Sequence, residues 1–199
     1  MTVPVVLAST SPTRAALLRN AGLMVETIAP AVDEEEVKLS LRADGVAPRD
    51  QADALAEMKA LRVSSRMSGV LTIGADQVLE CDGEAFDKPV DQAHAADQLR
   101  RLRSKTHYLH SAAVIAFDGA PIWRHIAKAR LTLRPFSDAF LDEYLADMGD
   151  DALATAGAYK IEGKGVQLFS QISGDYFGIL GLPLVELLGF LRVRGVLSE

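Results

Sequence analysis

Residues 3–18 read VPVVLASTSPTRAALL, an apolar run followed by a hydroxyl-rich segment and then by an apolar, helix-like pattern. The run 3–8 is typical of a short buried strand. Ser11 followed by Pro12 indicates a helix start, because a hydroxyl caps the first turn and proline at the first helical position loses no hydrogen bond. The stretch therefore predicts a strand that leads directly into a helix N-terminus.

The same helix start is a candidate anion site. The first backbone N–H groups of a helix have no partner within the helix and carry partial positive charge. Ser9, Thr10 and Ser11 add hydroxyls, and Arg14 adds a guanidinium group that fits phosphate oxygens. The alternative is a capped helix with a solvent-exposed arginine, which this stretch alone favours. The segment is not a Walker loop, because it lacks the glycines and the lysine–threonine pair.

Strands and helices alternate along the rest of the chain. We expect further strands over 24–28, 70–79, 106–117, 121–134 and 166–172. We expect further helices over 48–67, 91–104 and 183–194, and another that starts at Ser137. The acidic stretch 29–38 is expected to be irregular. Without repeats or a low-complexity linker, the pattern predicts one domain over residues 1–199, with a mixed, twisted sheet flanked by helices in an α/β fold.

Composition limits the classes of function. A chain of 199 residues, 49% of them hydrophobic, can bury a sizeable core in one domain. The net charge of −6 argues against a nucleic-acid polymer as partner, though not against a small anionic ligand. The single cysteine, Cys81, excludes an internal disulfide and fits a reducing cytoplasm. Since no apolar run is long enough to span a membrane and no signal-peptide pattern is present, neither membrane nor secretion is expected.

Two charged residues stand in apolar surroundings. Asp76 lies in the stretch IGADQV, where a buried carboxylate needs a partner or a cation. The small residues Gly74 and Ala75 before it allow another backbone to approach closely. Lys59 falls on the presumed buried side of the long predicted helix, although lysine is seldom buried without a partner. An aspartate satisfied by local amides is the structural alternative for Asp76.

Three further charged features are unremarkable when each is taken alone. Lys88 follows a predicted Asp-Gly turn, Glu34 belongs to an acidic run, and Lys160 and Glu162 alternate in the glycine-rich segment 157–165. Separately they read as a loop lysine, a solvated acidic loop and a turn with a surface ion pair.

Together, these residue types are those of a phosphate-chemistry site. Arginine, hydroxyls, two lysines and a helix N-terminus would hold a polyphosphate. Asp76, with Glu34 or a neighbouring residue, would hold a divalent cation, Mg²⁺ or Mn²⁺, and help to activate water. Phosphoryl transfer needs chiefly positioning and charge neutralisation from a protein.

Ordered blocks of sequence extend this pattern over almost the whole chain. They are LASTSPTR (7–14), APAVDE (29–34), LAEMKA (55–60), IGADQV (73–78), DGEAFDKP (82–89), TH (106–107), GAYKIEGKG (157–165) and GDYFGILGLPL (174–184). In order and spacing they resemble the Maf family of house-cleaning nucleotide pyrophosphatases. The resemblance implies two lobes around a deep cleft, as in inosine-triphosphate pyrophosphatases. It also implies metal-dependent hydrolysis of nucleoside triphosphates to monophosphate and pyrophosphate, and relatives are often homodimers.

The resemblance also implies roles for single residues. Asp76 matches the proposed catalytic acceptor of the family, and the polar cleft residues correspond to Ser9, Arg14, Glu34, Lys59 and Lys88. With Ser11 added from the local chemistry, we expect the triphosphate to lie along Ser9, Ser11, Arg14, Lys59 and Lys88, and the metal at Glu34 and Asp76. The positions linked to base choice correspond to Thr13, Gln77 and Glu162.

The base-choice residues favour one branch of the family. Gln77 and Glu162 match the 7-methyl-GTP branch, whereas the dTTP/UTP branch typically carries threonine and glutamine there. A glutamate can accept hydrogen bonds from guanine N1–H and the 2-amino group. Thr13 departs from both branches, because it stands where an aromatic side chain could stack on a cationic base. A dTTP/UTP pyrophosphatase and a nucleotide-binding regulator of septum formation are the alternatives; Asp76 beside two lysines favours an enzyme.

Overall fold

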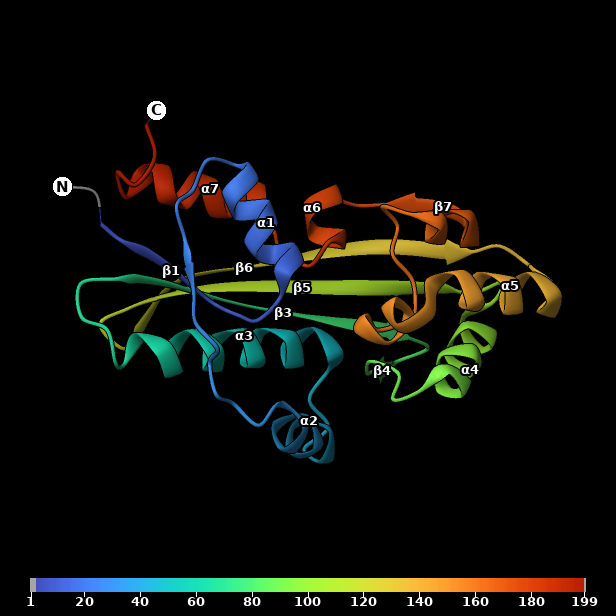
Figure 1. Ribbon diagram of the computed structural model, residues 1–199. Coiled ribbons are helices and arrows are strands. Elements are labelled where there is room, and N and C mark those ends of the chain that lie inside the picture. Colours follow the sequence, from blue (N-terminus) through green and yellow to red (C-terminus); the bar gives the residue numbers. More distant parts are fainter. Residues whose placement is uncertain (1–2, 199) are drawn as a thin grey trace. The chain divides into compact units, whose positions relative to one another are not determined.

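The predicted alternation of strands and helices is present in the computed structural model, which describes residues 3–198 (Figure 1). The strands are β1 (Val5–Ala8), β2 (Glu26–Thr27), β3 (Leu71–Cys81), β4 (Glu84–Phe86), β5 (Thr106–Phe117), β6 (Ala120–Leu133) and β7 (Phe169–Ser173). The α-helices are α1 (Pro12–Asn20), α2 (Glu34–Ala43), α3 (Pro48–Ser64), α4 (Gln92–Leu102), α5 (Asp138–Met148), α6 (Tyr176–Ile179) and α7 (Leu184–Val193). Two 3₁₀ helices are η1 (Gly149–Ala154) and η2 (Lys164–Leu168).

The strands form one mixed sheet in the order β2-β1-β3-β5-β6-β7, with β4 paired to β3. β1 runs parallel to both β2 and β3, whereas β4 is antiparallel to β3 and β7 is antiparallel to β6. The turn between β3 and β4 is the predicted one: Asp82 and Gly83 both have positive φ, at 54° and 83°. The mixed α/β sheet with flanking helices is therefore confirmed.

Two segments differ from the prediction. The prediction that the stretch 29–38 is irregular is wrong, because α2 begins within it. The Asp33 side chain caps that helix by accepting a hydrogen bond from Glu36 N at 3.1 Å, and three glutamates in the first turn face the positive end of the helix. The prediction of a strand over 166–172 is wrong for residues 166–168, because Lys164–Leu168 forms η2 before β7 begins.

The described chain forms two compact units. Unit 1 comprises residues 3–77, 110–128 and 174–198, and unit 2 comprises residues 78–109 and 129–173. By these bounds β3, β5 and β6 each contribute residues to both units. Across residues 3–198, every helix is too short or too polar to cross a bilayer.

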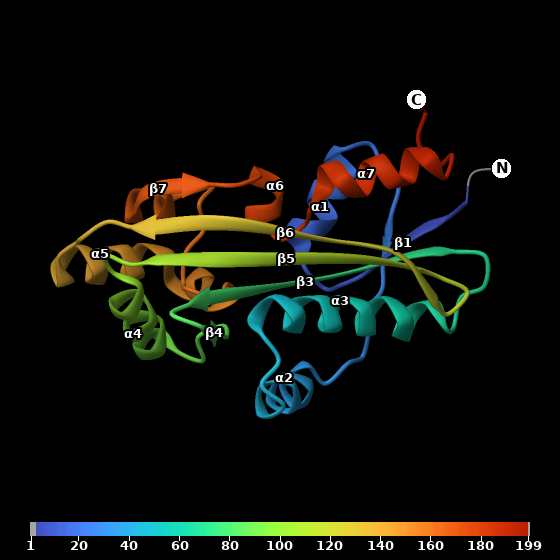
Figure 2. The same cartoon turned by 180° about the vertical axis from the view of Figure 1, so that it is seen from behind.

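Unit 1 has helices on both faces of its strands (Figures 1 and 2). Val5 and Leu7 of β1 belong to the apolar cluster that includes residues of α1 and α7. Val6 and Ala8, which point the other way in a pleated strand, belong to the cluster with α3. The strand–helix junction after Ala8 is therefore fixed from both sides, and with it the start of α1.

Unit 2 is built around the pairing of α4 with α5. Leu99 and Leu102 of α4 and Leu141 and Tyr144 of α5 are all inaccessible to solvent. This core supports two loops that carry predicted site residues: the loop after β4, with Lys88, and the segment between η1 and η2.

Candidate functional site

Gly74 sets the distance between β3 and α3 in unit 1. A Cβ atom at this glycine would lie 2.1 Å from the carbonyl oxygen of Ala56 and 2.5 Å from the backbone nitrogen of Ala60. Such contacts are impossible, so only glycine allows the helix to lie this close to the strand. The close approach expected from the sequence is confirmed, and it brings Lys59 of α3 against Asp76 of β3.

Lys59 bridges two carboxylates. Its Nζ lies 2.7 Å from Asp76 Oδ1 and 2.9 Å from Glu34 Oε1. Lys59 and Asp76 are 4% and 6% exposed, whereas the Glu34 side chain is 41% exposed. Asp76 Oδ2 is buried and makes no hydrogen bond within residues 3–198. A buried carboxylate oxygen without a partner is costly, so this atom is a candidate to accept a proton or to bind a cation.

The charge of Glu34 is set by its neighbours. Burial by itself would raise the pKa of the Glu34 carboxyl group, but the hydrogen bond and charge of Lys59 outweigh it, with help from Lys38 and Arg14. The pKa of Glu34 is therefore lowered. Glu34 is an ionised carboxylate at neutral pH, which is the form that a divalent cation requires.

The start of α1 is capped as the sequence predicts. Ser11 Oγ accepts a hydrogen bond from Arg14 N at 3.3 Å, and Ser9 Oγ accepts one from Ser11 N at 3.1 Å. Ser9 is only 5% exposed, and Thr13 lies half-buried in the first turn. Both serine hydroxyls act as acceptors in these bonds, so each keeps an O–H group to donate. The helix cap is confirmed, and phosphate binding at this helix start stays a prediction.

Arg14 reaches from α1 to two backbone carbonyls. Its Nε donates to Gly181 O at 2.8 Å, and its Nη1 donates to Ala75 O at 3.0 Å, directly before Asp76. Burial lowers the pKa of Arg14, while the charges of Asp76 and Glu34 oppose that shift. A guanidinium has five N–H groups, so three remain outside these bonds. Arg14 thus fixes the backbone at Asp76 as well as offering donors to an anion.

The side-chain amide nitrogen of Gln77 forms hydrogen bonds within the protein. Its Nε2 lies 2.7 Å from Ser111 Oγ, 3.0 Å from Ile179 O and 3.2 Å from Gly178 O. Ser111 Oγ also donates to Gly178 O at 2.7 Å. Of the Gln77 amide, only the carbonyl oxygen lies outside these bonds. The sequence reasoning missed Ser111, although a hydroxyl within the apolar run of β5 was a signal for it.

The predicted site residues divide between the units. Within unit 1, Glu34, Lys59 and Asp76 are in direct contact, and Arg14 joins them through the backbone at Ala75. The other predicted residues of unit 1 are Ser9, Ser11, Thr13 and Gln77. Lys88 and Glu162 belong to unit 2, and both are exposed.

The segment before Glu162 is held by buried polar groups of unit 2. Tyr144 OH donates to Ala158 O at 3.1 Å, and Tyr159 OH lies 2.7 Å from His107 Nε2. His107 is inaccessible to solvent, and burial lowers its pKa to about 4. The sequence showed His107 only as part of a matching block, because its partner Tyr159 lies in a distant segment.

Buried, neutral His107 predicts a loss of stability in mild acid. The pKa of His107 is about 4 in the folded protein, compared with an ordinary value of 6.5. Between these two values the imidazole is protonated in the unfolded chain but neutral in the folded chain, so acid favours unfolding. Stability from this group is complete above pH 6.5 and falls until pH 4. By pH 5 the loss is about 2 kcal/mol. Urea unfolding of the wild type and of His107→Gln at pH 7 and pH 5 measures it.

We expect the difference between the two pH values to shrink by that amount in His107→Gln. The matched control is His125→Gln, since His125 is partly exposed and lies 3.8 Å from Glu186 on the surface of unit 1. The control should keep the wild-type pH dependence. An equal pH dependence in wild type and His107→Gln would contradict the prediction.

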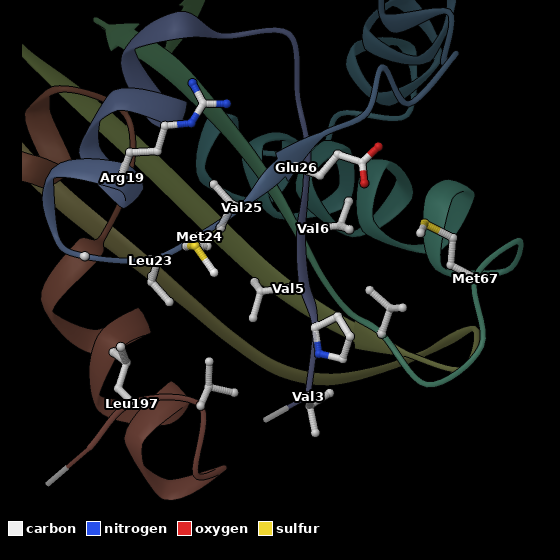
Figure 3. Close-up of a pocket in the computed structure, with 14 residues that line it drawn as sticks. Val3, Val5, Val6, Arg19, Leu23, Met24, Val25, Glu26, Met67 and Leu197 are labelled. Carbon is white, nitrogen blue, oxygen red and sulfur yellow. The ribbon is translucent and has the colours of Figure 1, made fainter. Parts of the chain in front are cut away.

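A separate hollow in unit 1 does not involve the predicted residues. It has a volume of about 950 Å³ and is lined mainly by apolar side chains of β1, of the segment from α1 to β2 and of the C-terminal end (Figure 3). Its charged lining residues are Arg19 and Glu26, one of each sign. This lining does not suit a triphosphate, so the Lys59–Asp76–Glu34 cluster remains the candidate site.

Sequence comparisons identify the family to which the chain belongs. A family model described as Maf-like protein matches residues 4–194. A protein of Hyphomonas neptunium named nucleoside triphosphate pyrophosphatase is 52% identical over 197 residues, 99% of each chain, and one of the same name from Caulobacter vibrioides is 53% identical over 195 residues, 98% of each chain. A protein of Brucella abortus named 7-methyl-GTP pyrophosphatase is 47% identical over 192 residues, 96% of each chain. The chain belongs to the Maf family.

Proposed function

We propose that this chain hydrolyses a non-standard or modified nucleotide, with 7-methyl-GTP favoured, to the monophosphate and pyrophosphate, and so removes it from the nucleotide pool. The general activity follows from the family: the chain is a nucleoside triphosphate pyrophosphatase, a hydrolase that acts on acid anhydrides. One observation carries the chemistry, namely the buried Lys59 that bridges Asp76 and Glu34 while Asp76 Oδ2 stays unpaired.

The choice of base is argued from Glu162 and from the 7-methyl-GTP pyrophosphatase of Brucella abortus. Glu162 is exposed, and its carboxylate can accept two hydrogen bonds from the N1–H and 2-amino groups of guanine. Its negative charge also favours a methylated, cationic base over a neutral one. Uracil and thymine offer one such donor, so the same carboxylate would bind them less well.

Charge balance supports a divalent cation. Arg14 and Lys59 are two positive charges against the two carboxylates of Glu34 and Asp76, so this cluster is neutral before any triphosphate binds. Residues 3–198 contain no group of three or more metal-ligating side chains of the His, Cys, Asp or Glu kind. Mg²⁺ commonly takes one or two carboxylates together with phosphate oxygens and waters. Glu34 and the unpaired Asp76 Oδ2 fit that requirement, and a bound ion would supply charge neutralisation at the phosphates.

The protein's own part in the reaction follows from these positions. Within unit 1, the O–H groups of Ser9 and Ser11 and the remaining N–H groups of Arg14 donate to phosphate oxygens. Lys88 of unit 2 is a phosphate contact that the family resemblance alone implies. Asp76 Oδ2 either accepts the proton of the attacking water or would hold the cation that activates this water, and Lys59 holds Asp76 Oδ1 in both cases. The water oxygen bonds to the α-phosphorus, the bond from that phosphorus to the bridging oxygen breaks, and pyrophosphate leaves.

A nucleotide panel tests the proposal. The purified chain is incubated with Mg²⁺ or Mn²⁺ and 7-methyl-GTP, GTP, UTP, dTTP or CTP, and pyrophosphate and orthophosphate are measured separately. We expect pyrophosphate, released fastest from 7-methyl-GTP. A preference for UTP or dTTP would overturn the substrate assignment, and tight binding without any product would favour a regulatory role.

Glu162→Gln tests the base contact within the same panel. The amide replaces the negative charge, so we expect kcat/KM for 7-methyl-GTP to fall by roughly tenfold, about the worth of one charged hydrogen bond. Rates on UTP should change little. Glu57→Gln, a change of the same kind on α3 of unit 1, is the control and should leave the substrate ranking unaltered. An unchanged ranking in Glu162→Gln would contradict the role of Glu162.

A further inference from the structure

Gln98 of α4 is a buried amide in unit 2 to which neither the sequence pattern nor the reaction assigns a role. It is 2% exposed. Its Nε2 donates to the backbone oxygen of Asp87 at 2.9 Å, and its Oε1 accepts from the backbone nitrogen of Gly157 at 3.0 Å. A carbonyl can only accept and a backbone N–H can only donate, so these two partners fix the orientation of the amide.

The two partners lie in the two loops of unit 2 that carry predicted site residues. Asp87 directly precedes Lys88, which is assigned to the phosphates, and Gly157 opens the segment that leads to Glu162, which is assigned to the base. One side chain therefore ties the phosphate loop to the base loop. A buried amide that loses a hydrogen-bond partner costs free energy, because its polar group is then shielded from water and unpaired.

The position of Gly157 leaves no room for a side chain in the present packing. Gly157 has φ +81°, and a Cβ there would meet Leu79 Cδ1 and Tyr159 Cε1 at 2.7 Å each. The following residues are fixed by Tyr144 and His107, as described above. The base loop is thus closely packed and hydrogen-bonded where Gln98 contacts it, and Gln98 links it to the Lys88 loop.

We propose that Gln98 is a positioning residue that makes the Lys88 loop and the Glu162 loop one binding element for the nucleotide. This inference rests on the proposed function, because it takes Lys88 and Glu162 as substrate contacts. Gln98 touches neither the substrate nor the reacting atoms. It acts by keeping the ammonium group of Lys88 and the carboxylate of Glu162 at a constant spacing.

Hydrogen exchange of the full chain tests the physical half of the proposal. Gln98→Met has similar length but no hydrogen-bonding amide, so backbone exchange should rise in both loops, residues 86–90 and 157–163. Gln92→Met is the matched control: Gln92 Nε2, on the same helix, donates to Gly149 O at 2.7 Å, which lies outside both loops. If Gln98→Met does not fold, Gln98→Asn, which is too short to reach both partners, takes its place. Unchanged exchange in either loop would overturn the proposal.

Kinetics of the same variants test the functional half. We expect Gln98→Met to raise KM for the nucleotide triphosphate roughly tenfold, with kcat changed less than KM, because the two lost hydrogen bonds position groups that bind the nucleotide and not the reacting atoms. In a Lys88→Ala background the same substitution should raise KM much less. Equal effects in both backgrounds, or an unchanged KM, would overturn the proposal.

Failure of the proposed function would look different. In that case the wild type would release no pyrophosphate, or Lys88→Ala alone would leave KM unchanged, while the exchange data would still report on the two loops.

Discussion

Asp76→Asn should reduce pyrophosphate release by at least about 10²- to 10⁴-fold, the usual cost of losing a general base. Asparagine has the same shape, but it cannot take a proton at the position of the unpaired Oδ2 or bind a cation there as a carboxylate does. Lys59 keeps Glu34 as a charged partner at 2.9 Å, so the fold should survive. Initial rates on the preferred nucleotide, together with urea unfolding, measure both expectations.

The matched control is Asp44→Asn, the same chemical change at the exposed C-terminal cap of α2. It should leave both turnover and stability unchanged. Near-wild-type turnover in Asp76→Asn, with the control also unaffected, would contradict the assignment of Asp76 to the reaction.

The dependence on metal separates the two tasks that Asp76 Oδ2 can perform. If Asp76 accepts the proton of water, the variant should be slow at every Mg²⁺ concentration. If Asp76 is chiefly a cation ligand, a higher concentration of Mg²⁺ or Mn²⁺ should restore part of the rate. The rate of pyrophosphate release by wild type, Asp76→Asn and Glu34→Gln, measured against the concentration of each cation, distinguishes these two outcomes.

The local pattern of the chain predicted most of the fold. Ser11 caps α1, β5 spans the expected residues 106–117, and Asp82-Gly83 forms the turn before β4. These features depend on neighbouring residues, so a sequence reading can find them. The missed α2 also had a local signal, since Asp33 followed by three glutamates is a good helix start, but the acidic composition suggested a loop.

The Lys59–Asp76 pair was predictable in its members but not in its contact. A buried lysine and a buried aspartate each need a partner, which pointed to Lys59 and Asp76 separately. Their pairing depends on how α3 packs on β3. Likewise, Arg14 binds the carbonyl of Gly181, 167 residues away in sequence, and no local pattern indicates that bond. Gln98 gave no signal for the same reason: besides His94 Nε2 on the same helix, at 3.3 Å, its partners are backbone atoms in two other segments.

Gly74→Ala should cost about 3 kcal/mol or more in the free energy of unfolding, at the upper end for overpacking in a core. The added Cβ would meet the backbone of α3 at Ala56 and Ala60, and backbone atoms cannot rotate away as a flexible side chain can. The helix must move off the strand, and because Lys59 lies on that helix, its contact with Asp76 must lengthen. Turnover should therefore fall even where the variant is still folded.

Gly189→Ala is the matched control for this substitution. Gly189 lies inside α7, and a Cβ there would meet no atom within 4 Å. Alanine is the better helix former, so this variant should gain about 0.5 to 1 kcal/mol while keeping wild-type turnover. Urea unfolding and pyrophosphate release of both variants give the comparison. Equal stability of Gly74→Ala and the wild type would mean that α3 can pack on β3 without the glycine. In the stretch IGADQV, Gly74 would then have no packing role, and only Asp76 would remain as a candidate functional residue.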